Sequence, residues 1–331
     1  MAITNTEIIR KAGALTTGGV TSGLLNAEQS RTFLKQVFEA TALGGLIRRE
    51  LRRSKTGEID KIGIASRILR KKVENIDANS NGSVPVLDPE TGQITGYRAK
   101  PSFSQITYAT TAVRLPWEIT EETLRENIEG QGLEATVTNL MTTQLGIDLE
   151  DLYLNGDEAT ATTDPDHDFL YINDGWVKQI LNGGHIKDAM EGGMDLDLFY
   201  DAVQAMPNKY NNGNLRWLMS PHRAQNWERY LLQKGLKAGG SYPDSLYKSP
   251  ASIPTVTVPA LSDDKIILTD PKNLIVVNTY GIIIRKTVEG KEAIMNDKRF
   301  YVVHLDFDPI IEELDATAII TNIGTEEGEA E

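Results

Sequence analysis

The short run Asp164–Asp168 (DPDHD) combines three aspartates with a histidine, so it is the first place to look for a metal site. A calcium loop of the EF-hand type that began at Asp164 would need glycine at its sixth position and glutamate at its twelfth, because these supply the sharp turn and the bidentate ligand. Phe169 and Gly175 stand there instead. We therefore expect these aspartates to cap turns or a helix end, and we expect no metal.

Histidines that could bind zinc or activate a nucleophile are few in this sequence. The chain has four histidines, His167, His185, His222 and His304. None is paired at i, i+4 and none lies in an HExxH setting, so a zinc site is not expected. Ser220 precedes Pro221-His222, but no GxSxG turn surrounds it. A helix N-cap explains Ser220 better, because proline is favoured at the first helical position.

A glycine-rich stretch and three pairs of adjacent carboxylates are even weaker indications of a catalytic or phosphate-binding site. The stretch KGLKAGG at 234–240 is basic and glycine-rich but lacks the GK[ST] ending of a phosphate-binding loop. Three pairs of neighbouring acidic residues lie at 121–122, 263–264 and 312–313. The two side chains of each pair point in different directions, so general acid–base catalysis by such a pair is not expected. We predict that the protein is not an enzyme and has no catalytic residue and no cofactor.

The composition is that of an ordinary globular protein. The chain has 331 residues, 40% hydrophobic and 24% charged, and no cysteine. Disulfides, thiolate metal sites and cysteine nucleophiles are therefore excluded. No apolar run approaches the ~18 residues that span a bilayer, and the first twenty residues lack the apolar core of a secretory signal. We expect a protein that works in solution without a membrane partner.

Charge is unevenly distributed along the chain. The formal net charge of -13 argues against nucleic acid as the main partner. Residues 1–72 carry 14 Lys+Arg against 6 Asp+Glu (+8), whereas the remainder carries 20 against 41 (-21). A basic segment joined to an acidic body can bind a polyanion or the acidic body of another copy. A well-solvated surface segment is the simpler alternative.

The N-terminal 45 residues predict an arm with one short helix. A polar, aperiodic stretch leads to Asn26, which has the character of a helix N-cap. Apolar residues follow at helical spacing: Phe33, Leu34, Val37 and Phe38. The pair Gly44-Gly45 ends this helix. Such a helix needs a partner surface, either on its own domain or on a neighbouring molecule.

Residues 55–111 predict a long β-excursion. Two turn-rich stretches interrupt it, NSNGS at 79–83 and DPETG at 88–92, and SFSQITYATTAVRLP has the composition of a strand. Large apolar side chains are too few for a core of its own. The segment is therefore either a flap or an element that another molecule completes.

Residues 133–156 (LEATVTNLMTTQLGIDLEDLYLNG) predict one long helix that ends at Asn155-Gly156. At 1.5 Å per residue it would span roughly 36 Å. Its other faces are polar but weakly charged, which suits a helix half-covered by neighbours. The apolar stripe that we expect in the core comprises Leu133, Val137, Leu140, Met141, Leu145, Leu149 and Leu152.

The remaining segments predict an α+β order without a repeat. The expected helices are 119–127 with Thr120 as N-cap, 194–207, and Pro221 to a stop at Gly235. The expected strands are 215–220, several within 253–288, and two within 299–323 separated by a turn at Asp308-Pro309. The acidic tail 326–331 is expected to be disordered. This order does not alternate as in βαβ proteins.

Three stretches, in sequence order, carry a resemblance to a known family: VRLPWEITEETLREN leading into LEATVTNLMTTQLGIDLEDLYLNGD, then FLYINDGWVKQI, then LRWLMSPHRAQNWERYLL. Over nearly its whole length the chain resembles the major capsid protein of tailed bacteriophages, the Hong Kong 97 fold. The resemblance implies these parts: an arm at 1–45, an extended β-hairpin loop at 46–115, a peripheral domain at 116–190 and 281–325 with a spine helix at 130–154, and an axial domain at 191–280.

The resemblance also implies where subunits touch. The candidate contact residues are Phe33, Val37, Phe38, Arg67, Arg70, Lys71 and Lys72. The basic ones would lie across the acidic body of an adjacent subunit, which would give the charge asymmetry a physical role.

The implied function is a major head protein that self-assembles into pentamers and hexamers, forming the icosahedral shell of the virion around double-stranded DNA. Assembly would take place in the cytoplasm of a host bacterium. Because the arm leaves no room for a scaffolding segment, the scaffolding protein would be separate or absent. A portal, decoration proteins and weakly contacted DNA are further implied partners, without a covalent crosslink. The alternatives are an encapsulin-like nanocompartment shell, an α+β enzyme, and DNA binding by the basic arm.

Overall fold

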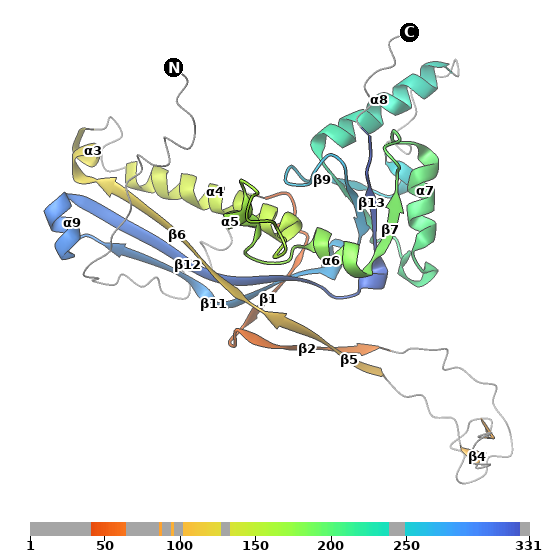
Figure 1. Cartoon of the computed structure of the whole chain (residues 1–331), viewed down its shortest axis with the longest axis horizontal. Helices are drawn as coiled ribbons and strands as arrows, with labels where there is room; N and C mark the ends of the chain where they lie inside the picture. Colours follow the sequence, from red (N-terminus) through yellow and green to blue (C-terminus); the bar gives the residue numbers. More distant parts are fainter. Residues whose placement is uncertain are drawn as a thin grey trace. The chain divides into compact units, whose positions relative to one another are not determined.

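The computed structural model describes residues 41–63, 86–87, 94–95, 102–126, 133–237 and 249–324. The chain divides into two units, one formed by Met1–Lys55 with Ala109–Glu331 and the other by Thr56–Tyr108. Figure 1 shows the two larger sheets and the helices of the first unit. Within the described ranges, no helix combines the length and the apolar character that a bilayer span demands.

The longest strands of the first unit form a four-stranded sheet with the order β1-β11-β12-β6. Its members are β1 (Arg48–Arg52), β11 (Leu274–Thr287), β12 (Lys298–Ile311) and β6 (Thr111–Thr120). β1 runs parallel to β11, and the other neighbours are antiparallel. In β12, Val303, Leu305 and Phe307 are buried while the residues between them are not, so one face of the strand enters the core. The helix α9 (Lys291–Asn296) closes the β11–β12 hairpin.

The helix predicted over 133–156 is α4 (Leu133–Asn155). It spans about 35 Å. The hydroxyls of Thr138, Thr142 and Thr143 each donate to the carbonyl four residues earlier, so this polar face satisfies part of its hydrogen bonding within the helix. The chain after α4 approaches another segment closely: a Cβ on Gly156 would lie 2.3 Å from the carbonyl oxygen of Asn173. Only glycine fits there.

The apolar stripe predicted along α4 divides into three groups. Leu145, Leu149 and Leu152 are buried, and Val137 and Met141 pack half-buried against the same core. The prediction for Leu140 is wrong, because its side chain is 64% exposed. Leu140 lies nine residues from Leu149, and nine steps of about 100° place the two on opposite faces of the helix. The side chain of Leu133 lies outside what the structure describes.

Two helices begin at the predicted caps. α3 (Glu121–Glu126) follows Thr120, whose hydroxyl oxygen accepts from the N–H of Thr123 at 3.2 Å. α8 (Pro221–Lys237) follows Ser220, whose hydroxyl oxygen accepts from the N–H of Arg223 at 3.2 Å. Both N-cap predictions are confirmed. The predicted stop at Gly235 is wrong, because α8 runs on to Lys237; a helical glycine costs only about 1 kcal/mol.

A five-stranded sheet with the order β7-β13-β10-β8-β9 carries the second core. Its strands are β7 (His185–Asp188), β13 (Thr317–Thr321), β10 (Ile266–Thr269), β8 (Arg216–Met219) and β9 (Thr255–Thr257). The helices α7 (Leu196–Ala205) and α8 lie beside it (Figure 1), and α6 (Trp176–Gly183) precedes β7. The ring of Phe199 contacts those of Trp217 and Trp227, with centroids 5.0 and 4.9 Å apart. Aromatic burial therefore fixes α7 and α8 on this sheet.

The two strands predicted within 299–323 belong to different sheets. No turn forms at Asp308-Pro309, and that prediction is wrong: β12 continues to Ile311, with Pro309 opposite Val276 of β11. β6 accompanies β12 as far as Phe307, so the proline falls where the described β12 has one strand neighbour and needs no second ladder bond. β13 pairs with β10 and β7 instead. The division into peripheral and axial domains stays a prediction.

The second unit contains two small sheets. β2 (Thr56–Gly63) pairs with β5 (Ser102–Ala109), and β3 (Val86–Leu87) pairs with β4 (Ile94–Thr95). We call the β2–β5 pair the ribbon. The turns predicted at 79–83 and 88–92 and the arm helix predicted to begin at Asn26 lie outside the described residues. Short helical segments complete the first unit: α5 (His167–Leu170), η2 (Asn208–Tyr210), η4 (Pro250–Ser252), η5 (Pro271–Asn273) and η6 (Leu314–Ala316).

Candidate functional site

The carboxylate-rich run Asp164–Asp168 forms a turn and the start of α5. Asp164 Oδ1 accepts from the backbone N–H of Asp166 at 2.9 Å, and His167 Nδ1 lies 3.0 Å from the carbonyl oxygen of Thr160. Across the described part of the chain, no three His, Asp or Glu side chains are grouped so that they could hold a metal ion. Asp164 thus caps a turn, as the sequence predicts, whereas the side chain of Asp166 makes no capping hydrogen bond to α5.

Ser220, His222 and Asp263 come together, but not in the order that an activated serine requires. The Ser220 hydroxyl donates to Asp263, and His222 Nδ1 lies 3.1 Å from the other oxygen of the same carboxylate. In a catalytic triad the histidine takes the hydroxyl proton and the carboxylate lies behind the histidine. Here the hydrogen bond from Ser220 lowers the pKa of Asp263, helped by His222. This group stabilises the start of α8 and does not form a nucleophile.

Large apolar side chains stand exposed on the ribbon. Ile62 of β2 is 69% exposed and Phe103 of β5 is 71% exposed, whereas Ile59 and Tyr108 are buried. A two-stranded ribbon is at best marginally stable by itself. Exposed apolar side chains on such an element indicate a contact surface for another molecule. Ile62 and Phe103 thus give the ribbon an exposed apolar surface.

Polar contacts within the first unit hold the two chain ends from which the ribbon leaves. Ala109 N–H donates to Asp308 Oδ2 at 2.7 Å, and Lys55 Nζ lies 3.2 Å from Asp306 Oδ2. Thr110 donates its N–H and its hydroxyl to the carbonyl of Lys55, at 2.8 and 3.1 Å. Burial raises the pKa of Asp308 to about 6. We call Lys55, Ala109, Thr110, Asp306 and Asp308 the ribbon root.

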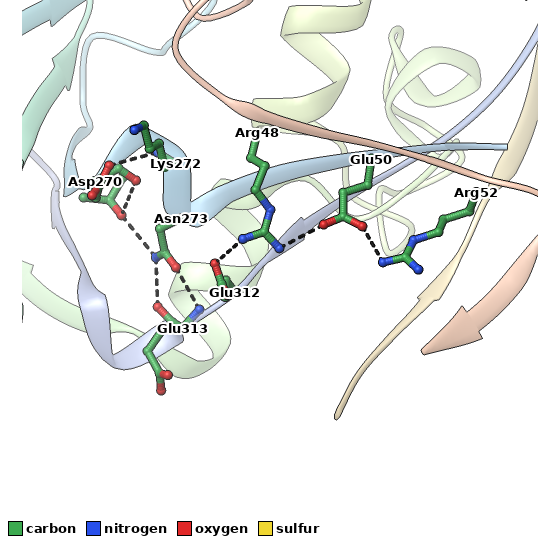
Figure 2. Close-up of polar contacts among 9 residues, drawn as sticks. Arg48, Glu50, Arg52, Asp270, Lys272, Asn273, Glu312 and Glu313 are labelled. Atoms are coloured by element: carbon green, nitrogen blue, oxygen red, sulfur yellow. Dashed lines mark hydrogen bonds and ion pairs between the residues drawn. The ribbon is translucent and has the colours of Figure 1, made fainter. Parts of the chain in front are cut away.

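A row of alternating charges follows β1, as Figure 2 shows. Arg48 lies 2.7 Å from Glu312 and 3.2 Å from Glu50, and the second oxygen of Glu50 pairs with Arg52. These side chains are about one-quarter to one-third exposed, so each pair contributes little to stability. β1 is an edge strand of the described sheet, and charges along an edge strand discourage pairing with a further strand.

Asn273 joins the start of β11 to the end of β12 (Figure 2). Its side-chain Nδ2 donates to the Glu313 carbonyl at 2.9 Å, and its Oδ1 accepts the Glu313 N–H at 2.8 Å. Asn273 is buried, and Asp270 caps the turn before it by accepting the N–H of Lys272 at 3.0 Å. This bidentate contact fixes the point where the chain leaves the long sheet for β13.

An ionic cluster fixes the opposite end of the long sheet. Arg299 of β12 lies 2.8 Å from Glu134 at the start of α4 and also binds Glu121 of α3. Lys286 of β11 pairs with Glu134 as well. Burial disfavours the charged carboxyl, but the hydrogen bond from Lys286 and the charges of Lys286 and Arg299 hold the pKa of Glu134 below its ordinary value. The cluster therefore joins two helices and two strands.

The contact residues predicted from the sequence stay predictions. Phe33, Val37, Phe38, Arg67, Arg70, Lys71 and Lys72 lie outside the described residues. The ribbon root and Asn273 were missed by the sequence analysis. Ala109 and Asp308 are 199 positions apart, and Asn273 and Glu313 are 40 apart, so no local pattern announces either contact.

The fold is that of phage capsid chains. The chain superposes on a chain of the satellite phage P4 procapsid that includes the size determination (Sid) protein, with TM-score 0.59, 16% identity and coverage of 89% of this chain and 100% of that one. A capsid chain of an empty GTA particle superposes with TM-score 0.56 and 10% identity, over 97% of this chain and 98% of that one. A chain of Mycobacterium phage Cain superposes with TM-score 0.55 and 10% identity, over 99% of this chain and 100% of that one. The expected α+β fold of the Hong Kong 97 type is confirmed.

Sequence similarity points to a particular relative. The chain is 26% identical over 333 residues to the prophage capsid protein YqbE of Bacillus subtilis (strain 168), covering 96% of this chain and 99% of that protein. No protein-family model matches the chain. These comparisons confirm the resemblance to phage major capsid proteins, and they favour it over the nanocompartment shell and the enzyme.

Proposed function

We propose that this chain is the major capsid protein of a tailed phage or prophage and that it self-assembles into the pentamers and hexamers of an icosahedral shell around double-stranded DNA. The observation that carries the proposal is the exposure of Ile62 and Phe103 on the ribbon of a chain that has a phage capsid fold. A neighbouring copy that covers these side chains would remove about 25 cal/mol per Å² of apolar surface from water.

The body of the subunit suits a thin shell. β11 and β12 are each 14 residues long, and polar contacts hold them at both ends: Asn273 at one end, and the cluster of Glu134, Lys286 and Arg299 at the other. α4 packs on the same sheet through Leu145, Leu149 and Leu152. These contacts join the two ends of the long sheet to neighbouring elements, which suits a body that keeps its shape within a shell.

Other partners follow from the same role. The net charge of -13 favours weak DNA contact, because most of the surface repels phosphate. We infer a separate scaffolding protein, a portal and decoration proteins as partners, and assembly in the cytoplasm of the host bacterium. The role is structural, with no catalytic activity; the arrangement of Ser220, His222 and Asp263 as a helix cap supports this.

Paired variants of the ribbon test the proposal. In a chain carrying Ile62→Ser and Phe103→Ser, the body should fold as in the wild type, by circular dichroism and thermal unfolding, but shells should not form. The matched control carries Ile62→Val and Phe103→Tyr, which keep the apolar contact, and it should assemble. Shells formed equally well by the serine variant would contradict the proposed role of the ribbon.

A further inference from the structure

A pocket of about 510 Å³ lies beside the C-terminal half of α4. This volume falls within the range of ordinary ligand sites. Its wall is mainly apolar, and two carboxylates also line it. The apolar members are Ala42, Ile147, Pro259 and Ala260, and the carboxylates are Glu150 and Asp151. None of the residues that the structure describes fills this space.

The described part of the chain gives the carboxylates of the pocket no basic partner. Among the described residues that line the pocket, none is Lys or Arg. Glu150 is 6% exposed and accepts the N–H of Leu43 at 3.1 Å, while Asp151 accepts from the Asn155 side chain at 2.6 Å. Burial raises the pKa of both, and the charges of Asp148 and Asp166 raise that of Asp151 further. A cation placed in the pocket would stabilise both charged carboxylates.

The apolar surface continues along α4 beyond the pocket. Ile147 is 48% exposed and Leu140 is 64% exposed. They are seven residues apart, so they lie two turns apart on the same face of the helix. A pocket that continues into an apolar helix face fits the mode in which an amphipathic helix packs into a groove. The matching occupant carries an apolar stripe and at least one Lys or Arg.

The chain itself supplies such a segment at the edge of the pocket. The described structure begins at Thr41, which lines the pocket, so the preceding residues start at its rim. Residues 26–40 (NAEQSRTFLKQVFEA) predict an amphipathic helix, and they carry Arg31 and Lys35 one turn apart. Because this segment is tethered at the rim, its effective concentration at the pocket is far above that of a separate molecule.

We propose that residues 26–40 bind this pocket on their own chain, with apolar side chains against Ile147 and a basic side chain at Asp151. The docked helix would cover Ile147 and would balance the charges of Glu150 and Asp151. The proposal does not depend on shell formation, because it concerns contacts within a single subunit, and its test uses unassembled chains.

Engineered cysteines test the contact, because the native chain has none. Ile147→Cys is combined with a second cysteine at Phe33, Leu34, Val37 or Phe38, in the full chain at low concentration under mild oxidation. At least one pair should form a disulfide within one chain, seen as faster migration without reductant. The matched control replaces Ile147→Cys by Ile294→Cys on α9, where the side chain is 69% exposed, and should form none.

Other outcomes would overturn the proposal. Disulfide-linked dimers would assign the pocket to a second copy of the chain, and no disulfide in any pair would mean that the arm does not bind there. Asp151→Asn tests the ionic part: it should slow disulfide formation about threefold at low salt and have no effect in concentrated salt. An unchanged rate at low salt would refute the contact between Asp151 and a basic side chain.

Discussion

Asp308→Asn should stabilise the folded chain at neutral pH. Asp308 lies in β12, and its Oδ2 accepts the Ala109 N–H at 2.7 Å. Burial, with a smaller effect of the Glu158 charge, raises its pKa from 3.8 to about 6, although the hydrogen bond from Ala109 lowers it. An asparagine in this position keeps an oxygen that accepts from Ala109 and removes the buried charge.

The magnitude follows from the difference in pKa between the unfolded and folded chain. A carboxyl whose pKa is raised on folding stabilises the fold below about pH 3.8, and this contribution is lost as the pH rises through about 6. The resulting cost of Asp308 is about 1 kcal/mol at pH 4.5 and about 3 kcal/mol at pH 7.5. Asp308→Asn should recover these amounts, less the difference between a charged and a neutral acceptor.

Urea unfolding of the unassembled chain at pH 4.5 and pH 7.5 measures this effect. The control is Asp306→Asn, two residues away, because Asp306 pairs with the exposed Lys55 and its loss should cost under about 1 kcal/mol. If Asp308→Asn were no more stable than the wild type at pH 7.5, and kept the same dependence on pH, the burial of a charge at the ribbon root would be refuted.

Two substitutions in and after α4 make further predictions. Leu149→Ala removes a side chain that is 3% exposed and should lower the free energy of unfolding by about 2–5 kcal/mol. Leu140→Ala removes an exposed side chain and should change the free energy of unfolding by under about 0.5 kcal/mol. Equal losses of the two variants in urea unfolding would contradict the assignment of the two helix faces. Gly156→Ala would bring a Cβ against the carbonyl of Asn173 and should lower the free energy of unfolding by more than about 1 kcal/mol. The control is Gly45→Ala, because a Cβ at Gly45 meets nothing within 4 Å. If the two variants had the same melting temperature, glycine would not be required at position 156.

The features that the sequence predicts well are those with local causes. α4 follows from the helical spacing of its apolar residues, and it ends at Asn155, directly before the glycine that marks a helix end in the sequence. Thr120 and Ser220 cap α3 and α8 because a hydroxyl before a helix accepts an N–H of its first turn. Each signal lies within four residues of the group that it affects.

The features that the sequence did not predict depend on distant partners. Pro309 suggested a turn, but it lies within β12, where the strand pairs with β11 on one side. β13 joins the five-stranded sheet, and no local pattern distinguishes a strand that pairs with β10 from one that pairs with β12. Leu140 shows the limit of periodicity: an apolar residue near a stripe can still lie on the face away from the core.

The ribbon root also depends on residues that are far apart in the sequence, so it could not be predicted either. Sequence patterns placed a contact element in residues 55–111, but the ribbon root joins Lys55 to Asp306 and Ala109 to Asp308 across the chain. Nothing in the sequence around Asp308 marks this residue as the acceptor of the Ala109 N–H. The role of Asp308 appears only when β6 pairs with β12, because this pairing brings Ala109, two residues before β6, beside Asp308.

Electron microscopy of the purified wild-type chain in negative stain, with sedimentation velocity at low and high salt, tests the capsid assignment most directly. The account predicts closed shells, or pentamers and hexamers that grow into shells, with an equilibrium that shifts as salt screens the contacts between basic and acidic surfaces. A stable monomer or small dimer at every concentration, even with a phage scaffolding protein supplied, would contradict it.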